Sequence, residues 1–207
     1  MVKPAPGKGL TRQQAAMKRG FDVVVALIGL ICVAWLIVIA WLLASWDTRS
    51  NGWFIQTRIG RFGKPFTVFK IKTMRDVAGG IPITVAGDSR ITPIGRVLRK
   101  FKLDELPQLI NVLIGDMSIV GPRPDLPGYA DKLVGEEALI LSIRPGITGP
   151  ASIKYSNEEV LLATQKDPAT YNRNVIWPDK VRINLAYIRD WRLASDIKYV
   201  WQTLTGA

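Results

Sequence analysis

The longest apolar stretch of the chain covers residues 23–46, 24 positions without a charge and with Ser45 as the only clearly polar side chain. A helix of this length reaches roughly 36 Å at about 1.5 Å per residue, enough for the hydrocarbon core of a bilayer. The run is too long for the apolar part of a signal peptide, and no small-residue cleavage site follows it. The pattern therefore predicts a membrane-inserted helix.

Basic residues flank this run on both sides. Those before it include Lys8, Arg12, Lys18 and Arg19, and those after it include Arg49, Arg58, Arg61, Lys64, Lys70 and Lys72. Because positive charge favours the cytoplasmic side, both flanks are expected there. A helix that dips into one leaflet and returns satisfies both flanks, whereas a single crossing with a short outer tail satisfies only one.

Beyond this run the hydrophobic pattern becomes short and mixed. Strand-like segments lie near residues 53–56 and 65–71, and Thr92-Pro93 predicts the start of a helix over residues 94–100. Residues 125–143 read as helical, and residues 178–204 alternate apolar and basic positions at helical spacing. Such C-terminal helices suit a membrane surface, although a core face with a solvated basic side is a comparable interpretation.

These elements predict an α/β fold that is mainly helical, with a compact cytoplasmic catalytic domain, a small β element and one N-terminal re-entrant helix. We divide the chain into a basic segment (1–20), the membrane-inserted helix (21–48) and a catalytic domain (49–207) that ends in interfacial helices. At 207 residues the chain is long enough for one domain with a real core.

Charge and composition narrow the chemistry. With 28 Lys and Arg against 17 Asp and Glu, the net charge of +11 implies an anionic partner such as nucleic acid, anionic lipid or a phosphorylated substrate. The chain has no histidine, which excludes Ser-His-Asp and Cys-His catalysis and imidazole metal ligands. Its one cysteine, Cys32, lies in the apolar run and excludes both a disulfide and a cysteine-based zinc site.

The remaining candidates for catalysis are adjacent carboxylates, Asp104 and Glu105, within residues 103–109. Pro107 fits the first turn of a helix, so a helix over residues 106–112 is expected to begin with Asp104 at or near its N-cap. The helix dipole would keep such a carboxylate ionised and attract phosphate. A plain capping acid beside a solvated acid is the simpler interpretation of the pair alone.

Three arginines are candidate phosphate ligands. Arg99 lies in the basic helix just before the acidic pair, and Arg123 and Arg144 each lie in a proline-containing turn. A rigid backbone suits arginine for bidentate phosphate contacts. Ordinary exposed loop arginines would give the same pattern.

Taken in order, a series of motifs resembles the bacterial sugar transferases known as monotopic phosphoglycosyl transferases, from about Lys18 to the C-terminus. The motifs are Lys18-Arg19-Gly20-Phe21-Asp22, the apolar run, and residues 56–60, 69–74, 103–109, 111–113, 115–118, 120–124 and 144–149. Any single motif is weak, but their number and order make the resemblance specific.

The resemblance implies transfer of a sugar-1-phosphate from a UDP-sugar to polyprenyl (undecaprenyl) phosphate, with Mg²⁺, at the cytoplasmic face of the bacterial inner membrane. It implies that Asp104 attacks the sugar-linked phosphate, releases UMP and contacts Mg²⁺, with Glu105 as its catalytic partner. It further implies that Arg99 holds phosphate with Lys70 close by. Together with Arg123 and Arg144 of the two proline turns, these are the predicted substrate-binding residues. The implied partners are these substrates and membrane lipid, not nucleic acid; a homodimer is compatible with the sequence.

Two positions depart from the family pattern. The Ser-Pro pair that usually breaks the apolar helix aligns with Ala34-Trp35, and a family Asp near the C-terminus aligns with Asn184. The sequence leaves open which sugar is transferred and which glycan pathway is served. It also leaves two alternatives: direct transfer in a ternary complex with Asp104 as a metal ligand, and a membrane-tethered basic binding module without catalysis.

Overall fold

The structure is a computed structural model that describes residues 9–75 and 88–206. Its longest element is α1 (Arg12–Thr48), one unbroken helix that begins with a capping box between Thr11 and Gln14. By length and composition α1 could cross a membrane. The predicted apolar helix is thus confirmed, and it begins within the basic segment rather than at residue 21. Ala34 and Trp35 lie inside the regular helix.

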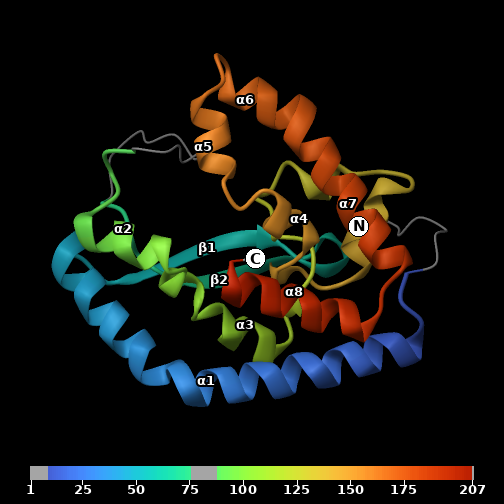
Figure 1. Ribbon diagram of the computed structural model, residues 1–207, viewed down its shortest axis with the longest axis horizontal. Coiled ribbons are helices and arrows are strands. Elements are labelled where there is room, and N and C mark those ends of the chain that lie inside the picture. The colour runs from blue at the N-terminus through green and yellow to red at the C-terminus, as the bar shows by residue number, and fades with distance from the viewer. Residues whose placement is uncertain (1–8, 76–87, 207) are drawn as a thin grey trace.

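Both ends of α1 rest on the same domain. Figure 1 shows α1 bowed around one side of the molecule, below α2, α3 and α8, instead of projecting away from it. At its C-terminal end the Ser45 hydroxyl accepts a hydrogen bond from Gly52 N at 2.9 Å, and the Asp47 carboxylate accepts one from Ile94 N at 2.8 Å. A bowed helix therefore returns to the domain without the proline break.

The two faces of α1 differ in what covers them. The inner face carries small and aliphatic buried residues, among them Ala26, Ile37, Ala40 and Ala44. The outer face exposes a continuous apolar stripe: Val24, Leu27, Ile28, Ile31, Trp35, Val38, Ile39, Leu42, Leu43 and Trp46. An apolar patch of this extent on a soluble surface marks an interaction site.

A β-hairpin forms the middle of the domain. Strands β1 (Trp53–Ile59) and β2 (Pro65–Ile71) pair antiparallel through the turn η1 (Arg61–Gly63), which confirms the two predicted strands. A second, parallel pair joins β3 (Ser118–Val120) to β4 (Gly146–Thr148). Only glycine fits at Gly146, because a Cβ there would lie 2.1 Å from Gly121 N.

Helices surround these two strand pairs. They are α2 (Pro93–Lys100), α3 (Gln108–Ile114), α4 (Pro150–Lys154), α5 (Glu158–Ala163), α6 (Pro168–Tyr171), α7 (Trp177–Arg189) and α8 (Leu193–Thr205). In Figure 1, α2 and α3 lie between the hairpin and α1, while α5 and α6 lie on the opposite side. The prediction of a mainly helical α/β fold with a small β element is confirmed.

One predicted helix is wrong. Residues 125–143 contain only two short 3₁₀ turns, η3 (Ala130–Lys132) and η4 (Glu137–Ser142). Gly128 and Gly135 adopt positive φ values of 103° and 60°, which interrupt any continuous right-handed helix. The apolar positions of η4 still enter the core, as Leu139 and Ile140 are buried.

Asn111 fastens α3 to the hairpin. This fully buried side chain donates to Thr67 O at 2.6 Å and accepts from Phe69 N at 3.1 Å. A buried amide that satisfies an edge strand cannot move without leaving polar groups unpaired. The segment before α3, which carries the acidic pair, is therefore held at a fixed place against β2.

A buried ion pair ties the start of α1 to the last two helices. Lys18 Nζ lies 2.7 Å from Asp196 Oδ2, and the Asp196 carboxylate also accepts from Tyr187 Oη at 2.6 Å and Trp191 Nε1 at 3.1 Å. Asp196 is completely buried. Three donors for one carboxylate satisfy the charge inside the domain.

We predict that Lys18→Met lowers the stability by about 3–5 kcal/mol, because it leaves the Asp196 charge buried and unpaired. Thermal unfolding of the detergent-solubilised protein checks this. Lys198→Met, on the exposed side of α8, is the matched control and should change little. A melting temperature for Lys18→Met equal to that of the control would contradict the importance of the pair.

Candidate active site

The acidic pair lies in a tight turn between α2 and α3. Asp104 and Glu105 belong to the 3₁₀ turn η2 (Leu103–Glu105), which Lys102 opens in a left-handed conformation at φ 53°. The predicted helix over residues 106–112 is corrected, since α3 begins at Gln108 with Pro107 as its N-cap. Asp104 is therefore not a capping residue, and the simple capping interpretation does not account for it.

Glu105 is held by two cations. Its Oε1 accepts from Lys70 Nζ at 2.8 Å and from Arg123 at 2.7 Å. Burial alone would raise the pKa of Glu105, but the charges of Arg123 and Lys70 hold it well below its ordinary value. Glu105 is thus an anion fixed through its Oε1 by a lysine of β2 and an arginine of the segment after β3.

Asp104 is in a different electrostatic state. It is half-buried and makes no ion pair within the described residues. Burial, and then the neighbouring charge of Glu105, raise its pKa, while Lys70 and Arg99 oppose that shift. A raised pKa means a more basic carboxylate that is still accessible. Of the two acids, Asp104 is the one free to act on a ligand.

Three of the predicted binding residues surround this pair. Lys70 comes from β2, Arg123 follows β3, and Arg99 lies in the last turn of α2, where its charge acts on Asp104. Burial lowers the pKa of Lys70, and the charge of Glu105 opposes that change. The structure therefore places cations from three elements, Lys70, Arg99 and Arg123, around the half-buried Asp104 carboxylate, and their role in substrate binding stays a prediction.

Arg99 already has an anionic partner. Its guanidinium contacts the Glu159 carboxylate of α5, and the neighbouring Glu158 accepts from Lys180 Nζ of α7 at 2.5 Å. A phosphate that bound Arg99 would have to replace the Glu159 carboxylate. Neither acid was selected from the sequence as a site residue, since a Glu-Glu pair at a helix start does not by itself indicate a binding site.

The structure does not bring Arg144 to the acidic pair. Its Nε donates to Gly115 O at 2.6 Å, just beyond the C-terminal end of α3, whereas the pair precedes the N-terminal end. The seven residues of α3 span about 10 Å. The two proline turns that looked equivalent in sequence thus direct Arg123 and Arg144 to opposite ends of α3.

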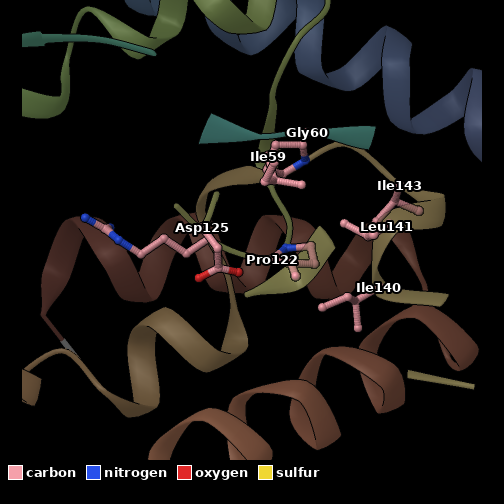
Figure 2. A pocket seen from close by; sticks show the side chains of 10 residues that line it. Ile59, Gly60, Pro122, Asp125, Ile140, Leu141 and Ile143 are labelled. Atoms are coloured by element: carbon pink, nitrogen blue, oxygen red, sulfur yellow. The ribbon is translucent and has the colours of Figure 1, made fainter. Parts of the chain in front are cut away.

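Asp125, two residues after Arg123, is a further charged group near the acidic pair. Burial raises the pKa of Asp125 to about 7, although Lys180, Arg58 and Arg123 oppose the shift. Figure 2 shows Asp125 on one side of Pro122 and the apolar side chains of Ile140 and Leu141 on the other. The cavity between them has only about 10 Å³, too little for a substrate.

The carboxylates of this site fit a Mg²⁺ ion that is bound by one protein carboxylate and by the substrate. Among the described residues, no three Asp, Glu or Cys side chains could hold a metal together. Lys70 and Arg123 occupy Glu105, which leaves Asp104 as the available carboxylate. Magnesium in phosphoryl-transfer sites often binds one or two carboxylates plus substrate phosphates, so Asp104 suits an ion that is shared with a diphosphate.

Asn184, the departure near the C-terminus, is buried on α7, and its Oδ1 has no hydrogen-bond partner within the described residues. A neutral amide at that position is a weak metal ligand. Asn184 lies on a helix that carries Lys180 on its preceding turn.

Comparisons with known proteins agree with this site. Residues 13–207 match the family described as Bacterial sugar transferase. The chain is 36% identical over 208 residues to a UDP-glucose:undecaprenyl-phosphate glucose-1-phosphate transferase of Caulobacter vibrioides, covering 96% of this chain and 73% of that protein. It is 34% identical over 189 residues to an uncharacterized sugar transferase of Bacillus subtilis, covering 91% and 85%.

A longer relative, the UDP-glucose:undecaprenyl-phosphate glucose-1-phosphate transferase of Escherichia coli, is 34% identical over 208 residues. The alignment covers 98% of this chain but only 42% of that protein. The chain belongs to the bacterial sugar transferase family. The predicted phosphoglycosyl transferase is confirmed at this level, and the alternative of a binding module without catalysis is set aside.

We predict that Glu105→Gln destabilises the protein by about 3 kcal/mol at pH 7, because Lys70 and Arg123 lose their anion. The pKa of Glu105 is lowered in the folded state, so its contribution is complete above about pH 5 and is lost as the pH falls toward that lowered value. The melting-temperature difference between wild type and variant should therefore shrink in acid. Glu137→Gln, at an exposed position, is the control, and a difference independent of pH would refute the assignment.

Proposed function

We propose that this protein transfers a sugar-1-phosphate from a UDP-sugar to polyprenyl phosphate, releases UMP, and so begins the assembly of a bacterial glycan. The observation that carries this proposal is the asymmetry of the acidic pair. Glu105 is bound by two cations, whereas Asp104 has a raised pKa and forms no ion pair with any residue of segments 9–75 and 88–206. The printed functions of the Caulobacter vibrioides and Escherichia coli relatives support the same substrate classes.

Asp104 is the nucleophile in this proposal. One of its carboxylate oxygens bonds to the phosphorus that carries the sugar, the bond from that phosphorus to the bridging oxygen of the diphosphate breaks, and UMP leaves with the electron pair. An oxygen of polyprenyl phosphate then attacks the same phosphorus and frees the carboxylate. The raised pKa supports this role, since a more basic carboxylate is the better nucleophile once ionised.

The surrounding side chains supply position and charge. Lys70 and Arg123 hold Glu105, which in turn fixes the η2 backbone beside it. When substrate binds, a substrate phosphate replaces the Glu159 carboxylate at Arg99, so the guanidinium keeps an anionic partner. Mg²⁺ held by Asp104 and the diphosphate would neutralise charge that develops on the phosphate oxygens.

A second candidate mechanism is direct transfer in a ternary complex, with Asp104 only as a metal ligand. That Asp104 pairs with no cation in the described part of the chain fits either mechanism. The covalent route is favoured on charge, because two phosphate-bearing substrates meet this small site one after the other instead of together.

The membrane proposal follows from α1. We place its exposed apolar stripe in the cytoplasmic leaflet of the inner membrane, so that the helix dips in and returns with both basic flanks on the cytoplasmic side. The bowed course of α1 and the contacts of both ends with one domain support this arrangement. The exposed Ile197, Trp201 and Leu204 of α8 are suited to rest at the same interface.

We predict that enzyme mixed with UDP-sugar and Mg²⁺, without polyprenyl phosphate, releases UMP in a burst no larger than the enzyme concentration. Asp104→Asn should abolish the burst and lower turnover at least about 10³-fold, because an amide does not attack phosphorus. A UMP assay and intact-protein mass spectrometry for the phosphosugar adduct measure both effects. The matched control is Asp190→Asn, at an exposed position after α7.

Two outcomes would separate the alternatives. Intersecting double-reciprocal plots with no adduct would favour the ternary complex and leave Asp104 as a metal ligand. Robust turnover by Asp104→Asn would exclude Asp104 from both mechanisms.

We predict that Gln13→Cys and Lys64→Cys, each with Cys32→Ala, react with an impermeant thiol reagent in inverted membrane vesicles and not in intact spheroplasts. The native Cys32, exposed on α1, should be protected in both preparations and react after denaturation. Labelling of the Gln13→Cys variant in spheroplasts would instead demonstrate a single crossing.

A further inference from the structure

A second charged site lies at the opposite end of α3 from the acidic pair. It is a cavity of about 270 Å³ between the first turns of α1, the turn η1 and the segment after η4. Arg19, Arg61 and Arg144 line it, and we call it the arginine cavity. Because α3 spans about 10 Å, a ligand bound here is out of reach of Asp104.

The three arginines are fixed in place, yet most of their N–H donors have no acceptor among the residues that the structure describes. Arg19 donates to Val112 O at 2.6 Å and Leu113 O at 3.0 Å, and Arg144 donates to Gly115 O. Arg61 donates to Ser142 O at 2.8 Å and lies over the ring of Phe62 at 4.4 Å. Each guanidinium has five N–H donors, so capping the end of α3 accounts for only a few of them.

The cavity also has an excess of positive charge. None of the three arginines has an ion-pair partner within the described residues. The fourth basic residue of the lining, Lys18, is neutralised by Asp196, and Asp22 is the one carboxylate among the described lining residues. Residues 1–8, which precede this part of the chain, contain no acid.

Mutual repulsion of the arginines agrees with this charge count. Burial, and then the charge of Arg19, lower the pKa of Arg144; burial, and then Arg144, lower that of Arg61. Arginines held close together against their own repulsion would gain from a shared anion. The hydroxyl of Ser142, which is buried in the wall and has no partner within the described residues, offers a further donor.

We propose that the arginine cavity binds a phosphate group, either that of an anionic phospholipid headgroup or free phosphate. Position favours the lipid, because the cavity lies where the apolar outer face of α1 begins, at Met17 and Val24. Headgroup phosphates lie at that depth, just outside the hydrocarbon, and basic pockets beside membrane helices bind them. This inference goes beyond the chemistry proposed for Asp104 and does not depend on it.

The test measures lipid binding to the full chain in neutral detergent by native mass spectrometry, with phosphatidylglycerol and phosphatidylcholine of equal acyl chains. Wild type should prefer phosphatidylglycerol. Arg61→Gln should bind phosphatidylglycerol about tenfold more weakly, because the variant loses a charged hydrogen bond. Lys64→Gln removes the same charge from the same turn outside the cavity and is the matched control. It should retain the wild-type preference.

Ser142→Ala provides a second variant with little risk to folding, and it should weaken phosphatidylglycerol binding severalfold. Calorimetry with inorganic phosphate distinguishes the two sources of the anion. Phosphate binding that Arg61→Gln abolishes, without a lipid preference, would assign the site to free phosphate. Equal losses in Arg61→Gln and Lys64→Gln, or neither lipid preference nor phosphate binding, would overturn the proposal.

Discussion

The contact between α1 and α3 is the constraint on which the other parts of the structure depend. Small residues on the inner face of α1 make it possible, since a Cβ at Gly29 would lie 3.2 Å from the Leu109 side chain. Arg19 of α1 then caps the last carbonyls of α3, and Asn111 on the other side of α3 holds β2. The short helix α3 therefore joins α1 to the hairpin that supplies Lys70.

This arrangement gives α3 two ends with different chemistry. Before its first turn lie Asp104 and Glu105, within reach of cations from β2, α2 and the segment after β3. Beyond its last turn lies the arginine cavity, which holds positive charge in excess. In the two functions that we propose, the half-buried carboxylate of Asp104 lies at the first end and the phosphate-binding arginines at the second, so chemistry and binding are separated along a single helix.

The acidic pair illustrates how neighbouring identical groups acquire different roles. Both carboxylates are partly buried, and burial by itself raises the pKa of each. The two direct ion pairs at Glu105 reverse that effect, and the resulting fixed charge then raises the pKa of Asp104 further. The two carboxylates differ because Lys70 and Arg123 form ion pairs with Glu105 and not with Asp104.

Local rules of the sequence determined much of the fold. The uncharged run of α1, the strand-like segments of β1 and β2, and the Thr92-Pro93 start of α2 depend on neighbours along the chain. The sequence also selected Asp104, Glu105, Lys70, Arg99 and Arg123, whose positions the structure now describes. The helix predicted over residues 125–143 does not form, because glycines there adopt positive φ values.

Only the tertiary structure decided that Arg123 faces Glu105 whereas Arg144 faces Gly115, and that Glu159 contacts Arg99. Those pairings join residues 18 to 60 positions apart, and their distances depend on how the helices pack, which no local pattern encodes.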